Sequence, residues 1–159
     1  MPKYAADTKV SRSKSRDQIE AILMRCGARE IFTNDMNSHN TLFVAWKIHG
    51  KPYKFVLPMP APDDIKFTRT ATGLMRGEAA AMDSWQKAVR QYWRIAREYI
   101  YMLTEMMEAC GMEFHEAFAP LLALSDGGNV WQIAAVNADA IQHQGTLLEL
   151  MGPEKKRGR

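Results

Sequence analysis

The chain has only two cysteines, Cys26 and Cys110, among its 159 residues. Two thiols cannot build the disulfide framework of a small secreted scaffold, and neither belongs to a zinc-binding Cys/His motif. Each precedes a glycine at a predicted helix end, so we interpret both as small buried apolar residues. We therefore expect neither a disulfide nor a metal site built on cysteine.

The sequence also lacks long apolar runs. No stretch approaches the ~20 apolar residues of a membrane span, and the N-terminus has no apolar segment typical of a signal peptide. We therefore predict no membrane association and a cytoplasmic location. The 47% hydrophobic and 25% charged content is ordinary for a globular protein, and this length suits one domain with a buried core.

Motifs for common chemistry are missing as well. There is no phosphate loop, no dinucleotide fingerprint and no Ser or Cys nucleophile elbow. His115-Glu116 begins like a zinc-protease helix, but Ala119 stands where the second histidine is required. Glu113, His115 and Glu116 could form an acid/base pair, although such residues more commonly make surface ion pairs. The sequence predicts no enzyme, no metal and no cofactor.

What the sequence does contain is positive charge at both ends. The net charge is +3, yet residues 1–16 carry five cations against one carboxylate, and residues 153–159 carry four against one. Residues 111–152 have five carboxylates and no Lys or Arg. Basic termini suit contact with nucleic acid or another anionic surface, and they also increase solubility. We predict a basic arm at 1–14 and a basic disordered tail at 153–159.

Apolar periodicity between these ends predicts a single α+β domain over residues 15–152. Ser15 with Gln18 fits a capping box at the start of a first helix, which Gly27 ends. The remaining elements are predicted in chain order: strands at 29–33, 41–49 and 52–57, a loop at 63–77, a long helix at 78–110, and short helices at 112–119 and 130–141. The first helix and the three antiparallel strands form one α-β-β-β unit, 15–62.

Residue types within the strands refine this prediction. Residues 34–40 have loop composition, and His49-Gly50-Lys51 predicts a tight turn. Alternation places one set of apolar residues on a shared face: Leu42, Val44, Trp46, Ile48, Tyr53, Phe55 and Leu57. The aromatic members could form an exposed platform for bases, but their aliphatic neighbours favour a core under the first helix. In the last helix, Trp131 marks the apolar side.

The predicted helix at 78–110 has two opposed faces, because successive residues turn by ~100°. One face is apolar and is predicted to pack the core: Trp85, Val89, Tyr92, Ala96, Tyr99, Leu103, Met106 and Cys110. The other face carries a stripe of cations: Lys87, Arg90, Arg94 and Arg97. The helix therefore indicates an anionic partner.

Nucleic acid is the partner that this stripe favours, since Lys and Arg neutralise phosphates and release counterions. Trp93 borders the stripe and Tyr101 continues it, and rings beside arginines can stack on unpaired bases. Three cations of the N-terminal region complete the predicted phosphate contacts: Arg12, Lys14 and Arg16.

The stripe also has a plainer interpretation. Glu98 lies four residues after Arg94, so part of the stripe could be ion pairs on a face that meets water or a protein. Glu105 and Glu108 end the stripe after about three helical turns.

Four stretches of the sequence occur together in a recognisable order. They are Tyr4-Ala5 with Thr8, Val10, Ser15-Arg16, Ile19-Glu20, Leu23, Arg25 and Gly27-Ala28; then Phe55-Val56-Leu57-Pro58-Met59-Pro60; then Trp85, Arg90-Gln91 and Trp93-Arg94; then Phe114 and Phe118 before Asp126-Gly127. In this order they resemble a family of small proteins of bacteriophages and integrated mobile elements. The resemblance covers residues 4–130 and implies such an origin without an established activity. Further lysines are usual after Trp93-Arg94, where this chain has Tyr101, Met102 and Leu103.

The resemblance implies two functional classes. Some small phage proteins handle DNA or RNA, which would use the basic stripe and arms and make the partner a nucleic acid or a nucleoprotein. Others disable host proteins, including CRISPR effectors, and would use the Met-rich and aromatic surface or the acidic region 111–152. We predict the first class, with non-enzymatic binding. The alternative is a host-directed inhibitor, for example an anti-CRISPR protein, that binds a host protein.

Overall fold

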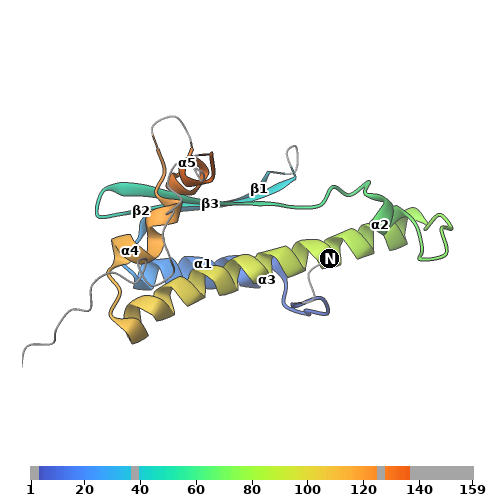
Figure 1. Cartoon of the computed structure of the whole chain (residues 1–159). Coiled ribbons are helices and arrows are strands. Elements are labelled where there is room, and N and C mark those ends of the chain that lie inside the picture. Colours follow the sequence, from blue (N-terminus) through green and yellow to red (C-terminus); the bar gives the residue numbers. More distant parts are fainter. Residues whose placement is uncertain (1–3, 37–39, 125–127, 137–159) are drawn as a thin grey trace, which may run out of the picture.

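The computed structural model of the chain describes residues 4–36, 40–124 and 128–136. A three-stranded antiparallel sheet lies over a layer of helices, as Figure 1 shows, which confirms the predicted α+β fold. The elements are α1 (Arg12–Arg25), β1 (Arg29–Met36), β2 (Thr41–Ile48), β3 (Lys51–Pro58), α2 (Ile65–Thr68), α3 (Glu78–Cys110), α4 (Phe114–Phe118), the 3-10 turn η2 (Ala119–Leu121) and α5 (Val130–Val136). The predicted tail at 153–159, with 137–152 before it, lies outside the described residues.

Helix α1 begins earlier than predicted. Its cap is Ser11, whose hydroxyl accepts a hydrogen bond from the backbone N–H of Lys14 at 3.2 Å. Ser15, the predicted cap, lies inside the helix and is fully buried. Either serine suits a cap, and packing of the helix on the core decides between them. Residues 12–14 therefore belong to α1 and not to an arm.

The sheet has the order β1-β2-β3 and is built on the predicted alternation. The four apolar residues of β2 that were predicted to share one face are all buried: Leu42, Val44, Trp46 and Ile48. The β2–β3 hairpin turns at His49 and Gly50, whose φ angles are both positive, as a two-residue hairpin turn requires. The predicted turn is confirmed.

β1 is longer than predicted and takes in half of the expected loop at 34–40. Residues 34–36 pair with residues 41–43 of β2. The hydrogen bonds of this pairing outweigh the turn preference of Asn34 and Asp35. Whether a segment forms a strand depends more on the neighbouring strand than on its own residue types.

Helix α3 has the predicted bounds, and Gly111 ends it with a φ of +66°. Its buried face differs from the predicted one and consists of Ala88, Val89, Gln91, Trp93, Ala96, Ile100 and Thr104. Tyr99, Met106 and Cys110, predicted in the core, are exposed. The buried face is turned towards the predicted cationic stripe because α1 packs along that side of α3 (Figure 1).

The C-terminal elements pack against β3 and the core. The Phe118 ring is fully buried and meets Trp46 edge to face, with ring centroids 5.9 Å apart. Leu122 bridges to Tyr53 at the edge of β3. Asn129 caps α5, because its Oδ1 accepts from the Gln132 N–H at 3.0 Å. Trp131, which was predicted to mark the apolar side of this helix, is 63% exposed.

The predicted loop at 63–77 contains the short helix α2, which the sequence did not indicate. Phe67 anchors it with 1% of its surface exposed. Four hydrophobic side chains remain exposed around this end of the molecule and define what we call the apolar tip: Ile65, Leu74, Met75 and Met82.

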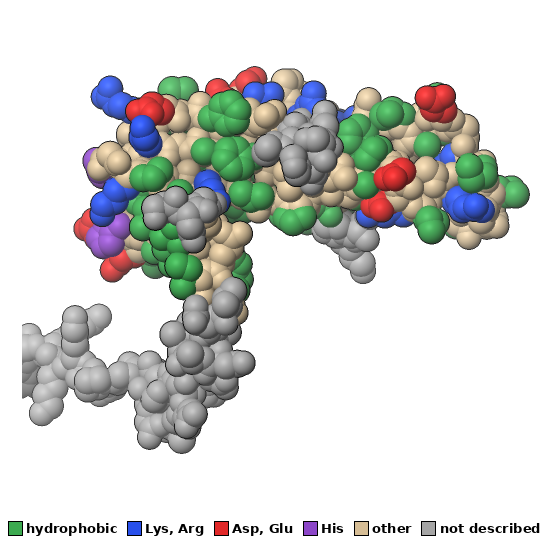
Figure 2. Space-filling model, turned by 90° about the horizontal axis from the view of Figure 1, so that it is seen from above, with side chains coloured by type: hydrophobic (Ala, Val, Ile, Leu, Met, Phe, Trp, Pro, Cys, Tyr) green, Lys and Arg blue, Asp and Glu red, His purple; other side chains and the backbone are tan. Residues whose placement is uncertain are grey.

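The outer face of the sheet, which Figure 2 shows, also keeps hydrophobic side chains among charged ones. Phe32 and Phe43 pack edge to face with centroids 6.2 Å apart, and Phe32 is more than half exposed. Lys47 pairs with Glu30 at 2.7 Å, between two well-exposed side chains. The main core therefore lies on the opposite side, between the sheet and the helices.

Candidate nucleic-acid interface

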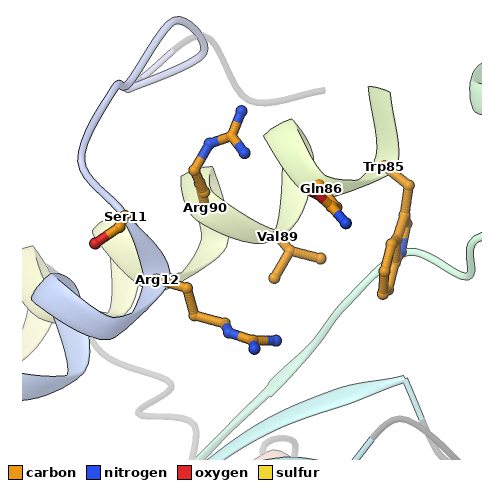
Figure 3. Close-up of a pocket in the computed structure, with 6 residues that line it drawn as sticks. All are labelled: Ser11, Arg12, Trp85, Gln86, Val89 and Arg90. Carbon is orange, nitrogen blue, oxygen red and sulfur yellow. The ribbon is translucent and has the colours of Figure 1, made fainter. Parts of the chain in front are cut away.

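Two adjoining hollows lie where the N-terminus of α1 meets the N-terminal half of α3. The first, of about 260 Å³, is lined by Ser11, Arg12, Trp85, Gln86, Val89 and Arg90 (Figure 3). The second, of about 520 Å³, is lined by Ala6, Asp7, Thr8, Lys9, Ser11, Lys87 and Arg90. Ser11 and Arg90 border both hollows, so the two form one depression, which we call the basic groove.

Cationic side chains from three segments of the chain line the basic groove. Lys9 comes from the N-terminal segment, Arg12 from α1, and Lys87 and Arg90 from α3, against the single carboxylate of Asp7. The first turn of α1 has no acidic residue, and its cap Ser11 lines the groove. The positive end of the α1 dipole therefore adds to the field of these cations.

The two α3 cations of the groove differ in their surroundings. Arg90 is partly buried, and no ion pair is found for it among the described residues. In Figure 3 its guanidinium points away from that of Arg12, on the other side of Val89. Lys87 pairs with Asp83 at 3.0 Å, but both side chains are 60% exposed, so water screens this pair strongly. Both cations can therefore meet an incoming anion.

The other half of the predicted stripe is occupied by contacts within the protein. Arg94 pairs with Glu98 at 2.9 Å, and its other terminal nitrogen donates to Gln18 of α1 at 3.1 Å. Arg97 also pairs with Glu98 at 2.9 Å, and only 19% of its side chain is exposed. The interpretation of this part of the stripe as ion pairs is confirmed for Arg94 and Glu98.

Tyr101 belongs to the same closed cluster. The Arg97 guanidinium lies 4.6 Å from the centroid of its ring. A hydrogen bond from the phenol to Glu105 raises the pKa of Tyr101. The ring and hydroxyl thus already have partners within α3, and neither borders the groove.

Arg16 connects α1 to β1. Its Nε donates to the Thr33 hydroxyl and its Nη2 to the Thr33 carbonyl, both at 3.1 Å. Its guanidinium also lies 5.8 Å from the centroid of the Trp93 ring. Lys14 is exposed on α1 but does not line the groove. Of the three N-terminal cations predicted to contact phosphate, the structure places only Arg12 in the groove.

Trp93 does not lie on the surface as predicted for a base-stacking residue. Its side chain has no exposed area and belongs to the main core. Burial of so large an apolar side chain is strongly favourable, and it turns this face of α3 inward.

Trp85 is the aromatic residue of the basic groove, and sequence reasoning assigned it to the core. Its indole Nε1 donates to the Pro60 carbonyl at 3.0 Å, which fixes one edge of the ring. The side chain is only partly buried and lines the first hollow. Pro60 and Pro62, which follow β3, lie far from Trp85 in the sequence, and no local pattern connected them to it.

A separate hollow of about 300 Å³ adjoins the β2–β3 hairpin. Two histidines that are far apart in sequence line it, His49 and His115, together with Glu113. Glu116 instead caps α4 by accepting a hydrogen bond from the Glu113 N–H at 3.1 Å. Within the described residues, no group of three potential metal ligands is found.

None of the helices in the described part of the chain is both long and apolar enough to span a membrane. Comparisons with protein families, curated proteins and solved structures find no match to this chain.

Proposed function

We propose that this protein is a non-enzymatic nucleic-acid-binding protein of the cytoplasm, with the basic groove as its contact surface. Its partner is DNA, RNA or a nucleoprotein. The observation that carries the proposal is that Lys9, Arg12, Lys87 and Arg90 all line the two adjoining hollows of the basic groove. Several cations that line one groove together attract the opposite charge of a phosphate group.

The groups that line the groove suit phosphate chemically. Guanidinium groups bind phosphate through two parallel hydrogen bonds, and Lys87 adds a point charge. The N-terminus of α1 offers backbone N–H donors beside them. Arg90 borders both hollows and can contact successive phosphates of one strand.

Arg90→Glu tests this proposal. For single-stranded DNA or RNA, four neutralised phosphates give a slope of log affinity against log salt of about −3, at roughly 0.7 for each contact. We expect the variant to have a shallower slope and an affinity at least about tenfold lower at ~50 mM salt, because a contact is lost and a repulsion gained. Fluorescence anisotropy of a labelled oligonucleotide over a salt series measures both quantities.

Lys51→Glu is the matched control, because it changes the net charge equally at the β2–β3 hairpin, where the side chain is exposed. It should bind as the unmodified protein does. An equal loss in both variants would show that net charge and not the groove determines binding. Absence of binding to any single- or double-stranded DNA or RNA at ~50 mM salt would contradict the proposed function.

The second candidate is a host-directed inhibitor that acts through protein–protein contact, and the apolar tip favours it. Ile65, Leu74 and Met75 are each about 70% exposed or more, and a hollow of about 410 Å³ lies beside Met75 and Met82. Clustered exposed apolar side chains of this kind are typical of protein-binding surfaces. The phage or mobile-element origin that the resemblance implies is compatible with both candidates.

Leu74→Glu/Met75→Glu distinguishes this candidate from the first. If the apolar tip binds a host protein, the unmodified chain recovers one specific protein from a bacterial lysate and this variant does not. Arg90→Glu should recover that protein unchanged. Equal recovery by the unmodified chain and the tip variant would contradict the inhibitor function at this surface.

A further inference from the structure

The first hollow of the basic groove has an aromatic wall as well as cations. The hydrogen bond from Trp85 to Pro60 holds the indole by its nitrogen edge, and the ring packs partly against the core. Figure 3 shows the ring standing beside the space that Val89 and the Arg12 side chain also border. An indole held in this way provides a rigid planar surface at little cost in side-chain entropy.

We propose that this hollow holds one unpaired base of a single-stranded nucleic acid, stacked on Trp85, with its phosphate beside Arg12 and Ser11. This inference rests on the proposed function and adds to it a preference for single strands. In a duplex each base is already stacked between its neighbours, so only an unpaired base can enter.

The composition of the hollow fits a base better than another ligand. Trp85 and Val89 supply apolar contact to the faces of a planar group, and the Gln86 amide can donate to and accept from its edge. A volume of about 260 Å³ lies just below the usual range of small-molecule pockets, roughly 300–1,000 Å³. One base with part of its sugar is therefore a suitable occupant.

The second hollow indicates a strand and not a free nucleotide. It adjoins the first at Ser11 and Arg90 and adds the cations Lys9 and Lys87. A single nucleotide in the first hollow would not extend to Lys9 and Lys87, whereas the next phosphate of a strand would reach them. Alternating base and phosphate contacts of this kind are the usual basis of single-strand binding.

The test compares oligothymidylate of about 12 nucleotides, an abasic strand of equal length and the corresponding duplex. The full-length protein should bind the oligothymidylate roughly 5- to 150-fold more tightly than the abasic strand, the range expected for stacking of one base. Trp85→Leu should remove this preference and leave the salt slope unchanged, because the phosphate contacts remain. Thymidine monophosphate should bind far more weakly than the strand.

Trp131→Leu is the matched control, since Trp131 is an exposed tryptophan of α5 outside the groove, and it should keep the full preference. Equal binding of the oligothymidylate and abasic strands by the unmodified protein overturns the inference and leaves the proposed function standing. Thymidine monophosphate binding as tight as that of the strand overturns the assignment to a strand. Absence of binding to every strand overturns both proposals. The comparison within the unmodified protein does not depend on whether Trp85→Leu folds.

Discussion

Replacing Trp93 with alanine should lower the free energy of unfolding by roughly 3–5 kcal/mol, the range for large aromatic residues in cores. Trp93 has no exposed surface, belongs to the main core, and has the Arg16 guanidinium over its ring. A chain of this size then melts about 6–20 °C lower. Urea denaturation followed by circular dichroism measures the change directly.

Trp131→Ala provides the comparison, because the same side chain is removed from a site that is 63% exposed. Its effect should stay within about 0.5 kcal/mol, as for most surface substitutions. A Trp93→Ala protein as stable as the unmodified one would contradict the placement of this ring in the core. It would also restore the sequence-based prediction of a surface ring for base stacking.

The second large effect is expected for Phe118→Ala. This ring is fully buried, meets Trp46 edge to face and stacks on Phe114 with centroids 4.4 Å apart. We expect a loss of roughly 3–5 kcal/mol in a single cooperative transition, because α4 shares its core with the sheet. Differential scanning calorimetry measures both the stability and the cooperativity.

Phe32→Ala is the matched control on the exposed outer face of the sheet, and about 1 kcal/mol or less is expected there. If Phe118→Ala produced two separate transitions, the C-terminal elements would be an independent unit. That result would contradict the single domain predicted from the sequence.

The parts of the fold that the sequence predicted depend on local signals. The bounds of α3 follow from its apolar periodicity and from Gly111, and the β2 face follows from simple alternation. The start of α1 and the end of β1 were misplaced because distant contacts decide them. Ser15 is drawn into the core, and residues 34–36 are held by pairing with β2.

The candidate site was predicted less well, because it depends on how α1 lies against α3. A helical pattern shows which residues share a face, but the partner helix determines which face is covered. Contacts with Gln18 and Glu98 occupy the Arg94 guanidinium. Arg90, one turn earlier, lines the basic groove and can contact a ligand. The same packing buries Trp93 and leaves Trp85 partly exposed, although both lie on one helix.

Helix α3 runs unbroken for 33 residues, about 50 Å at 1.5 Å per residue. The eight-residue strands span only about 27 Å. The N-terminal end of the helix therefore extends past the sheet, as Figure 1 shows. Its C-terminal end carries the exposed thiol of Cys110, about 30 Å along the axis from Arg90. Cys26 is only partly exposed and burial raises the pKa of its thiol, so we expect a fluorophore that alkylates thiols to react faster with the exposed Cys110. The protein thus contains its own fixed reference point for measuring, by energy transfer, where a bound partner lies.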